Sequence, residues 1–276
     1  MERILYGKPV ADTLIEKSLQ CIKEAYRGRK PALAVVRIGN DEASISYIKG
    51  LMKSCERANV EVLVIEMEES IAQEAACQKV CDLSADSKID GILLQLPLPK
   101  HLDERALIEC IAVDKDVDGI TMGNAGRFWL NQRAFTPCTA QAVMEVAKYY
   151  QIPLAGKRVV IFGRSQIVGK PLVQCFLNEH ATVSIAHSKT LDCKQLALDS
   201  DIIVSAVGKA DFIQRDWVNQ QVIFDVGINF KEGKLCGDVS NTAYEQADAY
   251  TPVPKGIGVV TNAVLISHVV EAYKRR

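Results

Sequence analysis

The sequence predicts an α/β protein built on mostly parallel sheet. Short apolar runs, such as residues 32–38 and 91–99, alternate along the chain with longer stretches that have helical spacing. A further run, residues 158–162, is followed by Gly163, by small residues and by a helical stretch that Pro171 can open as a first-turn proline. A strand, a tight turn and a helix N-terminus together are how α/β proteins hold a phosphate group.

Length and composition limit the class of protein. The 276 residues suffice for one large or two modest domains, and a net charge of -1 predicts no bulk attraction to nucleic acid or membrane. No apolar run reaches the length of a membrane span, and the N-terminus has no apolar signal core, so we expect a cytoplasmic protein. The nine cysteines are scattered without a C-x-x-C pair, which indicates free thiols and no metal site.

The first half is expected to alternate strictly between helices and strands. Gly28 ends the first helix, and prolines stop the last strand. The expected helices cover residues 8–27, 43–58, 70–85 and 103–111, and the expected strands cover 32–38, 60–65 and 91–99.

Residues 120–137 break this alternation with glycines and a proline, so we expect a domain boundary there. A linking helix over 138–150 follows, and the last helix, over 259–273, is expected to return to the first domain. Between them we expect strands over 158–162, 181–186, 201–206 and 221–225, helices over 170–179 and 193–198, and an extended segment over 250–258.

The turn after residue 162 is a weak motif by itself, because Ser165 replaces the second glycine of G-x-G-x-x-G and Gly169 comes one residue late. The next strand lacks the acid that binds the ribose hydroxyl of NAD, and the segment His187-Ser188-Lys189-Thr190 follows it instead. These groups, with Arg164, suit the 2′-phosphate of NADP. Alternatively, they are solvated side chains at a strand end.

Two other strand ends, residues 205–208 and 225–229, consist largely of small residues. Such segments allow a backbone to approach a flat ring closely. An ordinary turn from strand to loop explains either of them equally well.

Three polar side chains of the first half are candidates for ligand binding. Tyr47 lies on the inward face of a helix, Gln95 interrupts an apolar strand, and Asp118 follows Asp114 and Asp116 in a loop. A buried amide needs a hydrogen-bond partner or a ligand. The alternatives are a core glutamine with a protein partner and a solvated acidic loop.

With these motifs assembled, the chain resembles the methylenetetrahydrofolate dehydrogenase/cyclohydrolase family from end to end. The motifs that carry the resemblance are residues 36–41 with Ser44 and Tyr47, residues 90–99, 115–119, 137–139, 163–171, 187–190, 225–229, 237–239 and 251–254. Their number, order and spacing make the resemblance specific.

The resemblance implies two Rossmann-like α/β domains with a cleft between them, assembled as a homodimer. Residues 1–136, with the C-terminal helix 260–276 packing back, would form the folate-binding catalytic domain, and residues 137–259 would form the NADP-binding domain. The implied reaction of one-carbon metabolism is hydride transfer from 5,10-methylenetetrahydrofolate to NADP⁺. Hydrolysis to 10-formyltetrahydrofolate follows in most members.

The family's site positions transfer to this chain residue by residue. Asp118 would read the pterin, and Arg164 and Ser188 would face the 2′-phosphate. The catalytic positions match Tyr47, Gln95 and Asp118, which also bind substrate with Pro254 and Gly258, and the cofactor positions match Gly163, Arg164, Ser165, Val168, Gly169, His187, Ser188 and Ile228.

The sequence departs from the family pattern on the folate side. The lysine expected four residues after Tyr47 is Leu51, and further changes occur at Ala140-Gln141, Lys255 and Val259-Val260. Hydrolysis needs a titratable group to move protons, which leucine lacks, whereas hydride transfer mainly needs two oriented rings. We therefore expect a dehydrogenase with weak or absent cyclohydrolase activity. The alternatives are a fully bifunctional enzyme, a non-catalytic paralogue, and a Rossmann oxidoreductase of another kind.

Overall fold

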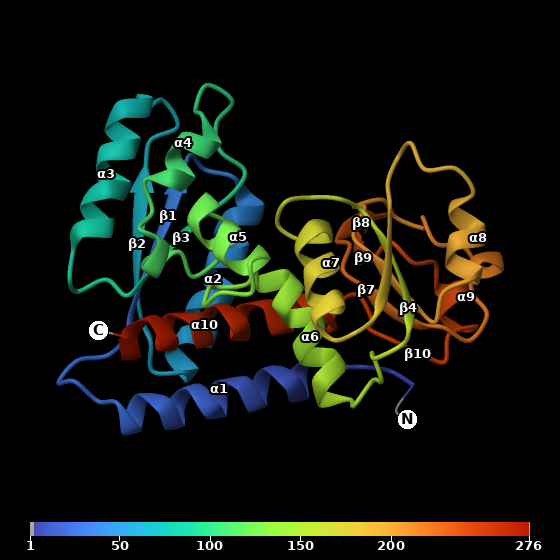
Figure 1. Cartoon of the computed structure of the whole chain (residues 1–276). Coiled ribbons are helices and arrows are strands. Elements are labelled where there is room, and N and C mark those ends of the chain that lie inside the picture. The colour runs from blue at the N-terminus through green and yellow to red at the C-terminus, as the bar shows by residue number, and fades with distance from the viewer. Residues whose placement is uncertain (1–2, 276) are drawn as a thin grey trace. The chain divides into compact units, whose positions relative to one another are not determined.

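The computed structural model describes residues 3–275 and divides the chain into two compact α/β units, whose elements are labelled in Figure 1. The N-terminal unit contains Asp12–Cys138 and the chain from Asn262 onwards, and the C-terminal unit contains Thr139–Thr261 and the segment up to Ala11. This last segment differs from the expected division. It groups with the C-terminal unit because Leu5 N donates to the carbonyl of Tyr250 at 2.8 Å.

The N-terminal unit has a parallel three-stranded sheet in the order β2-β1-β3. The central strand β1 is buried along its whole length, as its continuous apolar sequence predicts. Its elements are α1 (Gly7–Glu24), β1 (Ala32–Ile38), α2 (Glu42–Arg57), β2 (Glu61–Met67), α3 (Gln73–Ala85), β3 (Gly91–Leu94), α4 (Glu104–Glu109), η1 (Val113–Lys115), α5 (Met122–Trp129) and α10 (Ile257–Arg275).

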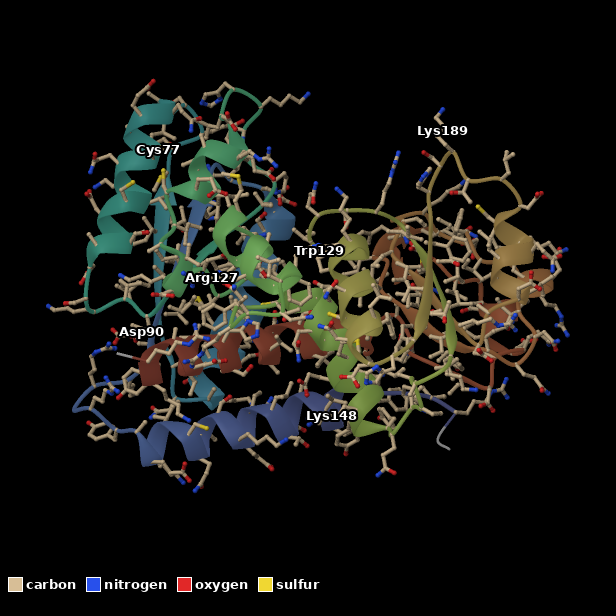
Figure 2. All side chains as sticks on the ribbon, viewed as in Figure 1. Cys77, Asp90, Arg127, Trp129, Lys148 and Lys189 are labelled. Atoms are coloured by element: carbon tan, nitrogen blue, oxygen red, sulfur yellow. The ribbon has the colours of Figure 1, made fainter. Side chains whose placement is uncertain are left out.

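One buried carboxylate joins the beginnings of two strands in this unit. Asp90, labelled in Figure 2, is fully buried directly before β3 and accepts from Ala32 N at the start of β1 at 2.9 Å. The Arg29 guanidinium donates two hydrogen bonds to the same carboxylate, at 2.6 and 2.7 Å. A buried charge needs such pairing to be stable, so Asp90 fixes where the two strands begin.

The C-terminal unit has a parallel five-stranded sheet in the order β10-β7-β6-β4-β5 and a separate antiparallel hairpin, β8-β9. In chain order this is the 2-1-3-4-5 arrangement of doubly wound sheets. Its elements are α6 (Cys138–Tyr149), β4 (Arg158–Phe162), α7 (Gly169–Asn178), β5 (Thr182–Ala186), α8 (Cys193–Leu198), β6 (Ile202–Ser205), η2 (Arg215–Trp217), β7 (Val222–Asp225), β8 (Asn229–Lys231), β9 (Lys234–Cys236), α9 (Asn241–Tyr244) and β10 (Ala249–Tyr250). The α/β class expected from the sequence is thus confirmed.

Two local expectations were wrong. The strand expected over residues 91–99 ends at Leu94, so Gln95 follows the strand instead of interrupting it. The segment over 120–137, where we expected a domain boundary and no helix, contains helix α5. This helix forms despite its glycines because the Thr121 hydroxyl caps it, accepting from Asn124 N at 3.2 Å.

Candidate functional site

The turn between β4 and α7 in the C-terminal unit is closed by two glycines. A Cβ atom on Gly169 would lie 2.1 Å from the carbonyl oxygen of Gly163, whose φ of +111° falls in the region that favours glycine. The Ser165 hydroxyl accepts from the N–H groups of Val168 and Gly169 at 3.2 and 3.4 Å. The irregular glycine spacing in the sequence therefore builds a tight turn at the start of a helix.

This turn lies where the strand order of the sheet reverses. Strand β4 pairs with β5 on one side and with β6 on the other. A Cβ atom on Gly163 would lie 2.3 Å from the carbonyl oxygen of Ala206, which directly follows β6. Open α/β sheets bind their ligands at the carboxyl ends of strands at such a switch point.

The segment predicted to face the 2′-phosphate lies beside this turn. Phe162 is paired with Ala186, and Gly163 N donates to the carbonyl of Ala186 at 2.9 Å, so the chain leaves β4 and β5 at the same edge. Arg164 and Ser188 are exposed there. The structure thus brings the two predicted groups of cofactor residues together.

His187 is half-buried within this segment and shapes it. Its ring atom Nδ1 accepts from Lys189 N at 3.2 Å, and its backbone N–H group donates to the Thr190 hydroxyl at 2.9 Å. Because Nδ1 accepts a hydrogen bond, the ring proton of a neutral His187 lies on Nε2. The imidazole therefore orders a loop whose lysine and serine side chains are exposed.

The small residues at the other two strand ends have an internal explanation. A Cβ atom on Gly227 would lie 2.0 Å from a carboxylate oxygen of Asp238, and one on Gly237 would lie 2.0 Å from a carboxylate oxygen of Asp225. Asp238 accepts from Val207 N at 2.8 Å and Lys209 N at 2.9 Å. These glycines make room for buried carboxylates that order the loops, a role that the strand-end pattern alone did not reveal.

Asp225 is fully buried, as is Asp238. It accepts from the Tyr244 hydroxyl at 2.6 Å and from the N–H groups of Asp238 and Val239 at 3.0 Å each. Burial raises the pKa of Asp225 to about 7, against the effect of these donors. Its contacts are all internal, which indicates a structural role.

Three further predicted residues also belong to the C-terminal unit. Pro254 and Gly258 are exposed, and Ile228 has 61% of its surface exposed. A Cβ atom on Gly258 would lie 4.0 Å from Cδ1 of Ile228, so these two residues are neighbours. An apolar side chain this exposed at a strand end is available for contact with a flat ligand.

In the N-terminal unit, two of the predicted catalytic residues interact. Burial raises the pKa of the Tyr47 phenol, and the charge of Asp118 raises it further. Burial likewise raises the pKa of Asp118 to about 7, while hydrogen bonds from Cys138 oppose the shift. A half-buried carboxyl group that changes charge near neutral pH is typical of functional sites.

The three aspartates of this loop have different roles. Asp114 is exposed and pairs with Arg127 at 3.5 Å, as expected for a solvated loop. Asp116 is fully buried and accepts from the N–H and hydroxyl groups of Thr121 at 2.8 and 2.7 Å and from the Asn124 amide at 2.8 Å. Asp116 therefore anchors the loop, and Asp118 is left partly accessible.

Gln95 lies at the same edge of this sheet as the acidic loop. The backbone N–H group of Gln95 donates to the carbonyl of Val36 at 2.8 Å, and its side-chain amide donates to the carbonyl of Leu96 at 2.9 Å. Ile92 forms an isolated parallel bridge with Asp116, after which the chain turns, since Gly119 N donates to the carbonyl of Asp116 at 3.1 Å. The amide of Gln95 thus has a protein partner.

Leu51 follows Tyr47 by one turn of α2 and is fully buried, and Cys55 follows by another turn and is also buried. The three residues form one stripe on the helix. Lys49 and Lys53, on either side of Leu51 in the sequence, are exposed. An apolar side chain thus occupies the position where the family pattern has lysine.

Two residues not predicted as functional border Asp118. Cys138 Sγ lies 3.7 Å from Nδ1 of His268, and both groups donate to the carbonyl of Val117, at 3.3 and 2.8 Å. Burial raises the pKa of the Cys138 thiol and lowers that of His268, so both side chains are neutral. The motif Pro137-Cys138-Thr139 was the available signal for the cysteine, and His268 had none beyond being polar in an apolar helix.

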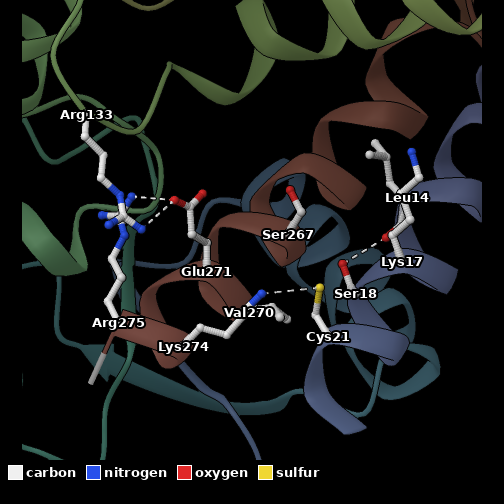
Figure 3. A pocket seen from close by; sticks show the side chains of 10 residues that line it. All are labelled: Leu14, Lys17, Ser18, Cys21, Arg133, Ser267, Val270, Glu271, Lys274 and Arg275. Carbon is white, nitrogen blue, oxygen red and sulfur yellow. Dashed lines mark hydrogen bonds and ion pairs between the residues drawn. The ribbon is translucent and has the colours of Figure 1, made fainter. Parts of the chain in front are cut away.

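A pocket in the N-terminal unit lies elsewhere, between α1 and α10 (Figure 3). It contains none of the predicted site residues. Its cations are Lys17, Lys274, Arg133 and Arg275, of which the two arginines pair with Glu271 at 3.3 and 2.7 Å.

Within residues 3–275, no helix is long and apolar enough to cross a membrane. Over the same residues, no group of three or more His, Cys, Asp or Glu side chains could hold a metal ion.

A doubly wound sheet with a glycine turn at its switch point is typical of dinucleotide-binding proteins. Matches to known protein families agree with this class. Residues 137–276 match the family model described as tetrahydrofolate dehydrogenase/cyclohydrolase, NAD(P)-binding domain, and residues 5–118 match the catalytic domain of the same family. The chain belongs to the tetrahydrofolate dehydrogenase/cyclohydrolase family.

Relatives match over nearly the whole chain. A bifunctional protein FolD from Bacillus cereus is 43% identical over 276 residues, which cover 99% of this chain and 96% of the relative. The crystal structure of FolD from Campylobacter jejuni has a TM-score of 0.96 at 36% identity and covers 99% of both chains. FolD from Trypanosoma brucei, complexed with NADP cofactor and inhibitor, has a TM-score of 0.93 at 31% identity and covers 100% of this chain and 99% of that one.

These matches confirm the family resemblance and the expectation that the second half binds a nicotinamide dinucleotide. The roles of the individual site residues stay predictions.

Proposed function

We propose that this protein catalyses the NADP-dependent oxidation of 5,10-methylenetetrahydrofolate to 5,10-methenyltetrahydrofolate, with weak or absent hydrolysis to 10-formyltetrahydrofolate. The observation that carries the proposal is the stripe of Tyr47 and Leu51 on α2. The charge of Asp118 acts on the Tyr47 phenol, but the next position on the same face of the helix is a fully buried leucine. Leucine has no titratable group for the proton transfers of hydrolysis, whereas hydride transfer, which the cofactor carries out, does not need one at this position.

The C-terminal unit would hold the cofactor. Gly163, Ser165 and Gly169 form a turn at a helix N-terminus that fits a phosphate, and the exposed Arg164 and Ser188 fit the 2′-phosphate of NADP. The NADP complex of the Trypanosoma brucei relative supports this choice of cofactor. Bound NADP⁺ supplies the hydride acceptor, and the residues of this chain orient it.

The N-terminal unit would hold the folate. The Asp118 carboxylate accepts hydrogen bonds from the pterin when it is ionised, and Tyr47 stays neutral at physiological pH because burial raises the pKa of its phenol. Of the other proposed substrate residues, Gln95 belongs to this unit, and Pro254 and Gly258 belong to the C-terminal unit. We propose the division into a folate-binding domain, residues 1–136 with 260–276, and an NADP-binding domain, residues 137–259, on the same grounds.

The test is an absorbance assay with methylenetetrahydrofolate and NADP⁺, repeated with NAD⁺. A methenyl signal that forms and decays no faster than spontaneous hydrolysis supports the proposal. Brisk decay establishes both activities, and no signal with either cofactor favours the non-catalytic paralogue.

Variants at Leu51 test whether the missing titratable group is what limits hydrolysis. Leu51→Lys should increase hydrolysis of purified methenyltetrahydrofolate several-fold, because its ammonium group can assist proton transfer. The matched control Leu51→Met preserves apolar volume without a titratable group and should leave hydrolysis unchanged. Equal rates in both variants would mean that the other folate-side changes limit the reaction.

A second candidate is the fully bifunctional enzyme. The observation in its favour is the pKa of Asp118, about 7, which lets this carboxyl group exchange protons near neutral pH. Brisk hydrolysis by the unmodified protein that is lost in Asp118→Asn but kept in the exposed control Asp114→Asn would support it.

We also propose a homodimer, through the edge of the C-terminal unit. Strand β5 is the last strand of its sheet, and Ile185 on it and Leu177 on the adjacent α7 are 38% and 46% exposed. Open strand edges with apolar side chains favour pairing with another chain. Light scattering should give a dimer, and Ile185→Asp should give a monomer. The nine free thiols support a reducing, cytoplasmic location.

A further inference from the structure

Three of the nine cysteines gather on one surface of the N-terminal unit, away from the residues of the proposed active site. Cys77 and Cys81 are one turn apart on α3, where Figure 2 labels Cys77, and Cys110 directly follows α4. The Cys110 thiol donates to the carbonyl of Ala106 at 3.2 Å, and burial together with the neighbouring Cys77 and Cys81 thiols raises its pKa. Cys81 is exposed, and the other two are partly accessible.

Hydrogen bonds on either side of the thiols hold the two segments together. Towards the start of α3, the Gln73 amide donates to Cys77 Sγ at 3.2 Å and accepts from Asp103 N at 2.7 Å. Towards its end, the Ser84 hydroxyl donates to the carbonyl of Cys110 at 2.8 Å. Cys77 and Cys110 also pack against the same apolar core, so the thiols are kept together by the fold.

A metal site does not explain this cluster, because among the described residues no set of three or more ligand side chains could hold a metal ion. Thiols held in contact are instead suited to disulfide exchange, in which a second thiol resolves a mixed disulfide formed at the first. The other free cysteines lie outside this cluster.

We propose that Cys110 and a thiol of α3 form a reversible disulfide when the protein meets a low-molecular-weight disulfide such as oxidised glutathione. In the first step the exposed Cys81 thiolate attacks the small disulfide and releases one small thiol. In the second, Cys110 sulfur attacks Cys81 Sγ, and the second small thiol leaves. The two protein thiols lose two electrons and two protons, which are carried away by the two small thiols.

The order of the steps follows from exposure and charge. Cys81 is accessible to a solute, whereas burial and the neighbouring thiols raise the pKa of Cys110 to about 12. Cys110 therefore reacts slowly with a disulfide in solution, and its attack is favoured only when the fold holds a mixed disulfide beside it. The second step should accelerate as the pH rises, by up to about tenfold per pH unit while the thiolate fraction is small.

The disulfide would join α3 to the segment that leads to Asp116 and Asp118. That segment is already attached to the end of α3, since Lys115 Nζ donates to the carbonyls of Leu83 and Asp86 at 3.0 and 2.5 Å. Oxidation would therefore add a covalent link between parts that are in contact, without requiring the unit to unfold.

The experiment is peptide mapping without reduction, on full-length protein treated with oxidised glutathione. Trypsin cuts between Cys77 and Cys81 at Lys79, and it separates both from Cys110 at Lys88 and Arg105. A peptide pair joined through Cys110 to either α3 thiol, lost on adding dithiothreitol, is the expected result. Glutathione adducts on separate, unlinked peptides would overturn the proposal.

Two variants complete the test. Cys110→Ser, which preserves the size of the side chain, should convert the internal disulfide into a persistent glutathione adduct on α3. Cys236→Ala removes a cysteine of the hairpin β8-β9 and should leave the internal disulfide unchanged. If Cys110→Ser fails to fold, the linked peptides of the unmodified protein still decide the question. The outcome is independent of the proposed enzymatic function.

Discussion

Cys138 Sγ lies 3.7 Å from Nδ1 of His268, and both side chains donate to the carbonyl oxygen of Val117. A cysteine beside a histidine can be a nucleophile and its base. Here the ring N–H of His268 donates its hydrogen bond to a carbonyl group and cannot accept the thiol proton at that nitrogen. Burial also favours the neutral form of both side chains. The pair therefore orders the chain next to Asp118, and it is not a reactive ion pair.

His268 should make stability depend on pH. Burial lowers its pKa in the folded protein, so between that value and the unfolded value of 6.5 only the unfolded state takes up the proton. Stability should therefore fall as the pH decreases below about 6.5, by up to about 1.4 kcal/mol per pH unit. Urea unfolding of the wild type and of His268→Gln measures this as a difference, in which the titration of Asp118 and Asp225 cancels. A difference that does not vary with pH would contradict the prediction.

Asp118 should control the pH dependence of catalysis. Its pKa of about 7 means that the carboxylate that accepts from the pterin is lost as the pH falls through about 7. We expect kcat/KM for methylenetetrahydrofolate to fall by about tenfold per pH unit below that point. Asp118→Asn should have lower activity without this break, and Asp114→Asn should keep it. A wild-type profile that is flat around pH 7 would refute the assignment.

Gly169→Ala should damage the phosphate turn. The added Cβ atom would lie 2.1 Å from the Gly163 carbonyl oxygen, so the turn must open, at a cost of about 1–3 kcal/mol of stability. NADP affinity, measured by calorimetry, should fall with it. The control Gly50→Ala meets no atom within 4 Å in helix α2 and should stabilise the protein by about 1 kcal/mol. Equal NADP affinities in the two variants would argue against a binding role for this turn.

Arg164→Gln should distinguish NADP from NAD. Loss of a charge-assisted hydrogen bond to the 2′-phosphate should raise KM for NADP⁺ by about tenfold or more and leave KM for NAD⁺ unchanged. Lys148→Gln, an exposed change on α6, is the control and should affect neither. A parallel rise for both cofactors would mean that Arg164 supports the turn instead of recognising the phosphate.

Lys255→Gly should relieve strain. Lys255 has a φ of +84°, in the region that favours glycine, and its carbonyl accepts from Gly7 N at 2.8 Å. Relief of about 1–2 kcal/mol of strain is partly offset by the greater freedom of glycine in the unfolded chain. We expect a net gain of up to about 1 kcal/mol in urea unfolding, and a loss of about 1 kcal/mol for Lys79→Gly in helix α3. A loss at both positions would show that the loop is not strained.

The sequence located most of the fold because its signals are local. Continuous apolar runs predicted the buried strands β1 and β4 with their observed bounds, Ala32–Ile38 and Arg158–Phe162. It missed α5 because the stability of that helix depends on capping by Thr121 and on a contact between Asn124 and Asp116, which no window of hydrophobicity registers.

By itself, the sequence determined the α/β class, the family, the glycine turn and the replacement of lysine by Leu51. Residue types and their spacing are sufficient for these. Only the tertiary structure separated the buried anchor Asp116 from the accessible Asp118, and assigned Gly227 and Gly237 to carboxylates instead of a ligand. Burial, and hence charge state, depends on neighbours that are distant in the chain. For the same reason, only the fold brought Cys110 beside α3.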